Sequence, residues 1–438
     1  MRNIILFTFT VHLIMQIAVN AGVKSEAPDI NYELSNPEDI KDALERVRDH
    51  LVRVTPYQIV ERKTGEPVTD FNEVKDAYVA KLPGHRIWTY EMGVVYTAMV
   101  QCTRVTGDQS FIDYAEKNYQ FVVDNLDYLE KVSEKYGYHK ERLMYALKPE
   151  HLDHCGSMGA AMIKLHKLRP DKRYLPLVDI ISNYIMKEQT RLKDGTLARP
   201  ARGDWEYTLW TDDLYMSIPF LVQMGKFSGD NTYYDEAIKQ LLQFAKYLFS
   251  EDKCLFDHAW YSHVKYDPHF FWGRQNGWAL LAMTEILDVI PEKYPGRDKV
   301  LDIFQRNIRS LIELQGRNGL WHQMLDREET YYETSCTAMF TYCVARGLNK
   351  GWLENVYGSV AIAGWNAIER KIMEDGQIEG VCTGTSVCND MVYYANRPQS
   401  ILAYHGYGPV LLAGSEMLEL LNNFDIKIVS NTFQFWHK

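Results

Sequence analysis

The sequence predicts an all-α protein, an (α/α)6 barrel in which six inner helices are enclosed by six outer ones. Apolar residues recur with helical spacing in segment after segment, separated by short loops of Gly, Pro, Asn and Asp, and strand signals are sparse. The helical segments are of two alternating kinds, and the pair repeats at roughly 50–60 residues, a period typical of helix-pair arrays. A solenoid of helical repeats is the alternative, but each inner segment has its own polar entry motif, which favours a shared central cavity.

Inner helices are expected where an aromatic or polar opening is followed by a run of small residues, as in "HLDHCGSMGAAMIKL" and "WTDDLYMSIPFLV". Small side chains let neighbouring helices approach closely, which a tightly packed inner ring requires. In chain order, the six predicted inner helices span residues 89–105, 151–168, 211–225, 274–289, 333–347 and 407–422.

Outer helices are expected where one face of the segment is charged, as in "GRDKVLDIFQRNIRSLIEL". A charged face must meet water, while the apolar face packs inward on the ring. In chain order, the six predicted outer helices span residues 37–53, 109–128, 174–189, 231–249, 297–315 and 353–371. No linker between them is long enough to divide the chain, so residues 22–438 are predicted to form one barrel domain.

The first 21 residues read as a secretory signal peptide. Arg2 supplies the positive start, Ile4–Val19 the apolar core, and the small residues ending at Ala21 a cleavage site. A membrane anchor is disfavoured because the apolar run is short for a span and is interrupted by His12 and Gln16. The mature chain is therefore expected to be exported, to a periplasm or beyond, and to be free of the membrane after cleavage.

Composition narrows the classes of partner. The net charge is -10 and no basic stripe is present, which argues against nucleic acid. The chain has 10 Trp and 29 Tyr, which form either a rich core or a cleft that stacks flat apolar faces such as sugar rings. The sequence carries no signal for the oligomeric state.

The seven cysteines do not describe a disulfide scaffold, because their number is odd and their spacing is wide. Cys336 and Cys343 lie in one helical pattern and fit buried small hydrophobes. Cys382 and Cys388 are near enough in sequence to bridge a loop, and this alternative stays open. A metal site built from "DHC" at residues 153–155 and the loop of His405 is disfavoured because no paired CxxC is present, so we predict no metal.

Two acidic positions at the starts of inner helices are candidates for chemistry, Asp153 in "EHLDHCGSMGAA" and Asp212 in "LWTDDLYM". Either can simply cap its helix. A cap, however, requires neither the neighbouring Trp210 nor two adjacent aspartates at 212 and 213. If the inner helices converge, two carboxylates at this end of the barrel can be held at different pKa values, as acid–base catalysis needs.

The loop that enters the fourth inner helix, "DHAWYSHVKYDPHFFWGRQNGW", is a candidate for binding. Arg274 can hold a carboxylate through its planar fork, and Trp272 and Trp278 can stack on a sugar ring. The alternative is a structural ion pair and core tryptophans. His258 in the same loop, like His322 beside Trp321 and like His405, can equally be a structural histidine.

Seven of these segments in the same order resemble the unsaturated glucuronyl and rhamnogalacturonyl hydrolases, glycoside hydrolase families 88 and 105. The resemblance covers most of the mature chain, and "FWGRQNGWA" with "ETSCTAMFTY" favours the rhamnogalacturonyl branch. The matching segments are Trp88–Gly93, Leu152–Ala161, Leu209–Pro219, Phe271–Met283, Gly319–Asp326, Tyr332–Trp352 and His405–Met417.

The resemblance implies an (α/α)6 barrel and a hydrolase whose mechanism requires no cofactor. Its substrate would be an anionic oligosaccharide with the 4,5-unsaturated uronic acid that polysaccharide lyases leave at the non-reducing end. In these families an Asp protonates C4, water adds at C5, and the resulting hemiketal collapses to release the next sugar. An ordinary inverting glycosidase, a sugar epimerase on the same barrel, or a non-catalytic oligosaccharide-binding protein are the alternatives.

The resemblance also implies roles for individual residues. The W-x-D motif places catalysis on Asp212 rather than Asp213, and the partner acid matches Asp153. Relatives often have a histidine upstream of this motif, where this chain has Arg199 and Arg202; an arginine there can meet the substrate carboxylate or a second anionic sugar. The predicted substrate-binding residues are Trp88, Tyr90, Arg202, Trp210, His258, Trp272, Arg274, Trp278, Trp321, His322 and His405.

Overall fold

The computed structural model describes residues 33–80, 86–137, 142–200, 206–263, 269–429 and 432–438. Within these ranges all twelve predicted helices are present, and the predicted all-α class is confirmed. The predicted signal peptide, residues 1–21, lies outside the described residues and stays a prediction. In the described ranges, no helix combines the length and the apolar character that crossing a membrane requires.

Six helices form a closed inner ring. Each contacts the next along the chain, and the last, α14, returns to contact the first, α3. Because a solenoid would leave its first and last units apart, this closure confirms the barrel. The inner helices are α3 (Tyr90–Thr106), α5 (Gly156–Leu168), α7 (Asp213–Ser228), α9 (Gly273–Val289), α11 (Thr334–Asn349) and α14 (Tyr407–Asn423).

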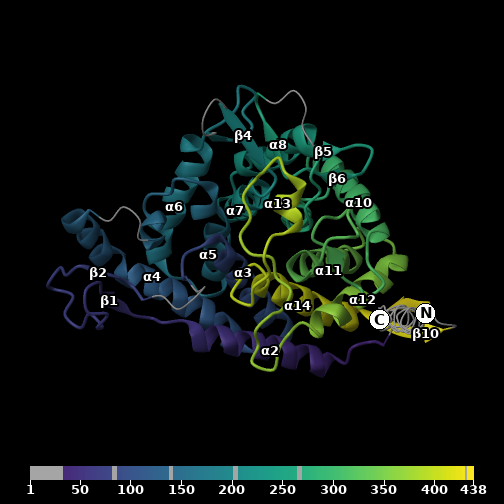
Figure 1. Cartoon of the computed structure of the whole chain (residues 1–438), viewed down its shortest axis with the longest axis horizontal. Coiled ribbons are helices and arrows are strands. Elements are labelled where there is room, and N and C mark those ends of the chain that lie inside the picture. Colours follow the sequence, from purple (N-terminus) through teal and green to yellow (C-terminus); the bar gives the residue numbers. More distant parts are fainter. Residues whose placement is uncertain (1–32, 81–85, 138–141, 201–205, 264–268, 430–431) are drawn as a thin grey trace, which may run out of the picture.

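Six further helices pack around the ring. Helices α4, α6, α8, α10 and α12 each cover the inner helix that precedes them, and α2 covers α14. Figure 1 shows α2, near the start of the described chain, beside α14 near its end, so the two ends of the sequence complete one helix pair. The outer helices are α2 (Pro37–Val54), α4 (Gln109–Tyr136), α6 (Leu175–Asn183), α8 (Thr232–Leu248), α10 (Arg297–Glu313) and α12 (Gly358–Glu369).

Small residues hold the inner ring together at its closest points. A methyl group on Gly156 of α5 would collide with the carbonyl oxygen of Met216 in α7. A methyl group on Gly408 of α14 would press on the backbone of Val94 and Val95 in α3. The small-residue openings noted in the sequence therefore serve the approach of neighbouring inner helices.

The strands are short antiparallel pieces in the loops. One three-stranded sheet matters for the site: β4 (Tyr207–Trp210) lies between β3 (Arg199–Pro200) and β7 (Ala259–Tyr261), with Trp210 opposite Ala259. It brings segments before α7 and before α9 together at the start of α7. The other pairs are β1 (Ile59–Glu61) with β2 (Ala77–Val79), β5 (Phe249–Ser250) with β6 (Leu255–Phe256), β8 (Trp321–His322) with β9 (Tyr332–Glu333), and β10 (Phe424–Val429) with β11 (Thr432–His437).

Two details of the helices differ from the prediction near the site. The predicted helix 151–168 begins as a separate 3₁₀ turn, Leu152–His154, and α5 starts only at Gly156. Trp88 secures this turn by donating its indole N–H to the carbonyl oxygen of His154 at 2.7 Å. A short helix that we did not predict, α13 (Met391–Ala395), lies in the long connection between α12 and α14.

Candidate active site

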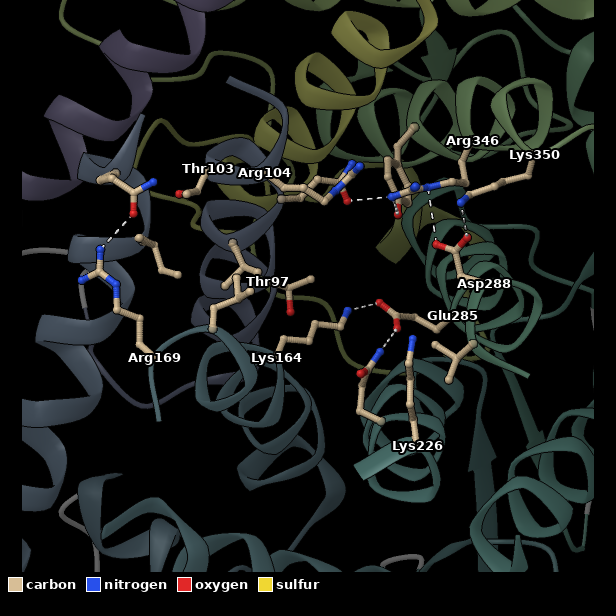
Figure 2. A pocket seen from close by; sticks show the side chains of 18 residues that line it. Thr97, Thr103, Arg104, Lys164, Arg169, Lys226, Glu285, Asp288, Arg346 and Lys350 are labelled. Atoms are coloured by element: carbon tan, nitrogen blue, oxygen red, sulfur yellow. Dashed lines mark hydrogen bonds and ion pairs between the residues drawn. The ribbon is translucent and has the colours of Figure 1, made fainter. Parts of the chain in front are cut away.

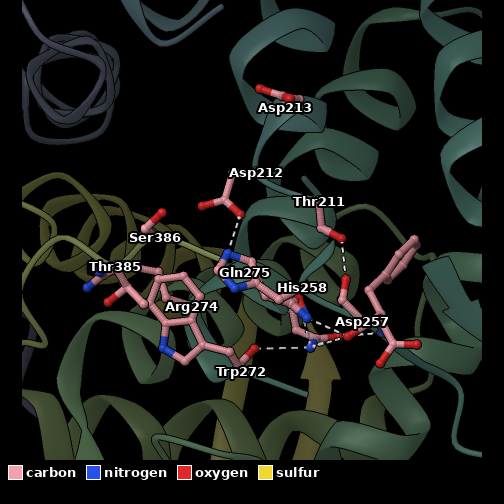
Figure 3. A network of polar contacts seen from close by, with 12 residues as sticks. Thr211, Asp212, Asp213, Asp257, His258, Trp272, Arg274, Gln275, Thr385 and Ser386 are labelled. Carbon is pink, nitrogen blue, oxygen red and sulfur yellow. Dashed lines mark hydrogen bonds and ion pairs between the residues drawn. The ribbon is translucent and has the colours of Figure 1, made fainter. Parts of the chain in front are cut away.

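The candidate catalytic residues gather where the N-termini of the inner helices meet. Asp153 lies in the 3₁₀ turn before α5, and Asp212 lies directly before α7. Figure 3 shows Asp212 above the side chains of His258, Trp272 and Arg274, which come from the segment before β7 and from the start of α9. The polar and aromatic residues at the starts of the inner helices thus lie at one end of the barrel.

Asp212 faces a buried histidine. Nε2 of His258 lies 3.2 Å from Oδ2 of Asp212, and neither atom makes an aligned hydrogen bond with any described residue. Such contacts in substrate-free sites often tighten only when substrate binds. Burial acts to raise the pKa of Asp212, but His258 and then Arg199 outweigh it, so that the pKa lies below its ordinary value.

His258 is fixed from its other side by a residue that the sequence reading missed. Nδ1 of His258 lies 2.7 Å from the hydroxyl oxygen of Tyr394, which α13 carries into the site. The histidine is 1% exposed and its ring centroid lies 4.8 Å from that of Trp272. His258, Trp272 and Asp212, all predicted for the site, therefore do meet.

Arg199 links the two acidic segments. Its guanidinium donates to both oxygens of Asp153, at 2.8 and 3.2 Å, and to both oxygens of Asp213, at 2.6 and 2.9 Å. It also lies over the ring of Trp210, 4.1 Å from the ring centroid. Arg199 is thus occupied by the protein's own carboxylates, a role that the sequence did not reveal. Arg202, the other predicted arginine, lies outside the described residues.

Asp213 is the first residue of α7, where its charge suits the helix dipole. It is also completely buried. Burial raises the pKa of Asp213 to about 6, against the opposing effect of Arg199. A carboxyl with no exposed surface cannot touch a substrate, so between the two adjacent aspartates it is the partly exposed Asp212 that faces the site.

Tyr90, Trp278 and His405 form a second group, on α3, on α9 and just before α14. The hydroxyl of Tyr90 lies 2.6 Å from Nε2 of His405, and the edge of Tyr90 meets Trp278. Burial and then the nearby charge of Arg274 lower the pKa of His405 well below its ordinary value, which keeps this imidazole neutral. The structure therefore joins these three predicted residues through direct contacts.

Arg274 was predicted to hold a substrate carboxylate, but in this substrate-free structure its guanidinium binds backbone carbonyl oxygens. Its two terminal nitrogens donate to the carbonyl oxygens of Cys382 and Thr383, each at 2.6 Å, and its guanidinium lies 4.6 Å from the ring centroid of Trp272. With 1% of its surface exposed, Arg274 anchors the connection between α12 and α14 in this substrate-free form.

Three other predicted binding residues have structural contacts. Trp88 is buried and holds the turn of Asp153. Trp321 is fully buried and donates its indole N–H to the carbonyl oxygen of Leu311, so no face of its ring is free for a sugar. His322 lies in the β8–β9 hairpin, where its ring packs against Tyr332 at a tilt of 35° with centroids 4.1 Å apart.

Cysteines and metal ligands add little to this site. All seven cysteines are free thiols, Cys382 and Cys388 included. Among the residues that the structure describes, no three His, Cys, Asp or Glu side chains are grouped as a metal site would need.

A cavity of about 700 Å³ lies at the opposite end of the barrel (Figure 2). The C-terminal parts of inner helices line it, and it contains none of the predicted site residues. Several of its charges pair with one another: Lys164 with Glu285, and both Arg346 and Lys350 with Asp288. Size alone therefore does not mark the active end.

Comparison with known proteins gives a family match. Residues 59–421 match the family described as Glycosyl Hydrolase Family 88. An unsaturated rhamnogalacturonyl hydrolase, YesR, of Bacillus subtilis (strain 168) is 26% identical over 268 residues, which is 60% of this chain and 76% of that protein. An unsaturated 3S-rhamnoglycuronyl hydrolase of Alteromonas sp. (strain LOR) is 33% identical over 216 residues, 48% of this chain and 51% of that protein.

Solved structures share the fold at low identity. A possible member of the GH105 family from Salmonella enterica subsp. enterica serovar Paratyphi A str. ATCC 9150 aligns with a TM-score of 0.68 and 21% identity, over 88% of this chain and 95% of that one. An unsaturated glucuronyl hydrolase specific for heparin aligns with a TM-score of 0.64 and 13% identity, over 88% of this chain and 99% of that one.

Proposed function

The chain belongs to Glycosyl Hydrolase Family 88 and is a glycoside hydrolase, and we propose that it removes the 4,5-unsaturated uronic acid from the non-reducing end of lyase-made oligosaccharides. We further propose that rhamnose is the sugar that follows the uronate. The names of the two curated relatives, a rhamnogalacturonyl and a rhamnoglycuronyl hydrolase, support this choice. The same proposal includes export of the protein through the predicted signal peptide, to the compartment that holds such lyase products.

The observation that carries the proposal is the pair of Asp212 and His258. Asp212 lies at the N-terminus of α7 with part of its carboxylate exposed, while His258 is buried behind one of its oxygens. The other oxygen points away from the histidine (Figure 3). One oxygen is thus held by the protein, and the other is free to carry a proton to a substrate.

In the proposed reaction, Asp212 delivers a proton to C4 of the vinyl ether. The low pKa of Asp212 describes the substrate-free protein. The bound substrate carries a carboxylate on C5. Its negative charge near Asp212 favours the protonated acid and raises the pKa of Asp212, as like charges do. Acid–base catalysis of this kind supplies a rate factor of about 10²–10⁴.

Water then adds at C5. Asp153, whose two oxygens are held by Arg199, orients this water on the other side of the site. The hemiketal at C5 opens to a ketone, the ring oxygen stays on C1 as a hemiacetal hydroxyl, and C1 becomes an aldehyde as the next sugar leaves with a proton. One water is consumed for each glycosidic bond cleaved, the proton that it loses on adding to C5 restores the acid Asp212, and no cofactor is required.

The test is turnover of lyase digests by the purified protein. We expect loss of the ultraviolet absorbance of the conjugated uronate from digests of rhamnogalacturonan or ulvan, and release of a saturated sugar with a rhamnose end. Turnover of saturated uronosides instead would indicate a conventional glycosidase. Binding without turnover of any of these, or of lyase-digested glycosaminoglycans, would contradict the proposal and indicate a sugar-binding protein.

A further inference from the structure

We propose that Tyr394 is a positioning residue, which holds the imidazole of His258 in the tautomer that directs Nε2–H at Asp212. The inference rests on the proposed function, since it concerns the proton on Asp212. Tyr394 comes from α13, in a connection that the sequence pattern presents as a loop. Its contact with His258 joins residues 136 positions apart.

The direction of the Tyr394–His258 hydrogen bond follows from a third group. The backbone N–H of Cys388 donates to the hydroxyl oxygen of Tyr394 at 3.1 Å. If Tyr394 also accepted from His258, its own proton would be buried without an acceptor among the described residues, because Tyr394 is 1% exposed. Tyr394 therefore donates to Nδ1 of His258.

The same tautomer follows from the opposite side of the ring. Nε2 of His258 faces Oδ2 of Asp212, 3.2 Å away, and an ionised carboxylate can only accept. Nε2 must then carry the proton. A neutral imidazole has only one, so Nδ1 is the acceptor, which matches the direction deduced from Cys388.

Packing fixes the ring and the hydroxyl in this arrangement. Tyr394 packs on Phe270, with centroids 5.1 Å apart, and meets His258 edge-on at 5.4 Å. Its carbonyl oxygen accepts a hydrogen bond from Nε2 of Gln323 at 3.2 Å. The segment is anchored further by Arg274 at Cys382 and Thr383. Tyr394 is thus held by contacts that do not depend on its hydroxyl.

As a consequence, the two carboxylate oxygens of Asp212 have different roles. Oδ2 stays engaged with Nε2–H of His258, and the proton destined for C4 resides on Oδ1. The other tautomer would present a lone pair to Oδ2 and draw the proton of Asp212 away from the substrate. In the Ser–His–Asp triad, changing the group that holds the histidine tautomer likewise lowers the rate by a large factor.

The chain offers a matched pair of variants, Tyr394→Phe and Tyr393→Phe. The hydroxyl of Tyr393 also accepts a backbone N–H, that of Ser386 at 3.1 Å, but the ring has no contact with His258 in the structure. Each change removes one hydroxyl from the same short helix. We expect kcat of Tyr394→Phe to fall about 10- to 100-fold, the range for groups that orient a reacting residue, with KM nearly unchanged.

Nitrogen NMR of histidine-labelled protein supplies a readout independent of activity, with the His258 signals identified by their loss in His258→Gln. In the wild type we expect a protonated Nε2 and an unprotonated, hydrogen-bonded Nδ1. Tyr394→Phe should lose the hydrogen-bond shift of Nδ1, and Tyr393→Phe should not.

A protonated Nδ1 in the wild type, or equal spectra and equal kcat for the two variants, would overturn the proposal. If the wild type leaves every unsaturated digest untouched, the proposed function fails, whereas the spectra still decide the role of Tyr394. Thermal unfolding of both variants checks that the fold is retained.

Discussion

The two ends of the barrel use the same helices in opposite ways. At the N-terminal end, carboxylates of Asp153, Asp212 and Asp213 gather around one arginine and one histidine. At the C-terminal end, lysines and arginines line a cavity and several of them pair with an acid, as Lys164 does with Glu285 (Figure 2). Both placements suit the helix dipoles, which favour anions at helix N-termini and cations at C-termini.

What separates the ends is the number of buried polar atoms left without an aligned partner. Around the cavity, among the described residues, these are only Oγ1 of Thr103 and Nε of Arg346, and the latter lies 3.5 Å from Asp288. At the other end they cluster. Among the described residues they include Oδ2 of Asp212, Nε2 of His258, Nε1 of Trp210, Nε1 of Trp272, Nε of Arg274 and Nδ1 of His405. Unsatisfied buried groups are costly, so their concentration indicates the catalytic end more clearly than cavity size does.

The largest effect that this comparison predicts is that of Asp212→Asn. The amide keeps the shape of the side chain but cannot deliver a proton, so turnover of the unsaturated substrate should fall by about 10²–10⁴. Circular dichroism and thermal unfolding should show a retained fold. Substantial activity in this variant would place the proton donor elsewhere.

The next effect compares two arginines that face buried carboxylates, one at each end of the barrel. Arg199 faces the fully buried Asp213, and Arg346 faces the fully buried Glu416 at 3.1 Å. Replacing either by Met strands a buried carboxylate, which should cost about 3–5 kcal/mol in the free energy of unfolding, measured in urea. Only Arg199→Met should also lose activity, because it releases Asp153.

The two variants contradict the proposed difference between the ends of the barrel if both lose the same activity. Equal loss of kcat in Arg199→Met and Arg346→Met, assayed well below their unfolding temperatures, would mean that the C-terminal end contributes to catalysis.

A smaller effect concerns the pH dependence of stability at Asp213. Burial raises the pKa of Asp213 from 3.8 in its ordinary range to about 6, so the folded state favours the protonated form. The resulting stabilisation is complete below about pH 3.8 and is lost as the pH rises through about 6. Asp213→Asn should therefore flatten the fall in unfolding free energy across this window, which is on the order of 1 kcal/mol per pH unit. Urea titrations at several pH values measure it, and an unchanged slope would contradict the assignment.

The smallest effect is expected for Lys226→Ala, at the mouth of the opposite cavity. Lys226 is exposed and lines the cavity. Its removal should change kcat/KM little and the unfolding free energy by less than about 0.5 kcal/mol, as for an ordinary surface position. A clear loss of activity would make this cavity part of the functional surface.

The sequence predicted the helices well, because helical periodicity is a local property that each segment shows by itself. It failed where a distant residue decides the local structure. The predicted helix at 151–168 is interrupted before Gly156, where Trp88 holds the carbonyl oxygen of His154. Nothing within the segment itself indicates that contact.

The site shows the same contrast between local sequence signals and contacts made by distant residues. The sequence singles out Asp212 and Asp153 because both lie at the starts of inner helices and in segments that resemble the family, Asp212 also beside Trp210. The roles of Arg199 and Tyr394 depend on partners far away in sequence, Asp153 for one and His258 for the other. A double tyrosine in "MVYYANR" is a weak signal, and only the three-dimensional arrangement distinguishes Tyr394 from Tyr393.

The measurement that tests the central claim most directly is a trapping experiment with methanol as a second nucleophile. If Asp212 protonates C4, methanol in place of water should add at C5 and give a stable ketal, with the ring intact and the next sugar still attached. Asp212→Asn should form none. A methyl glycoside at C1 of a uronate that retains its C4=C5 double bond would instead show direct cleavage of the glycosidic bond, and would contradict the account.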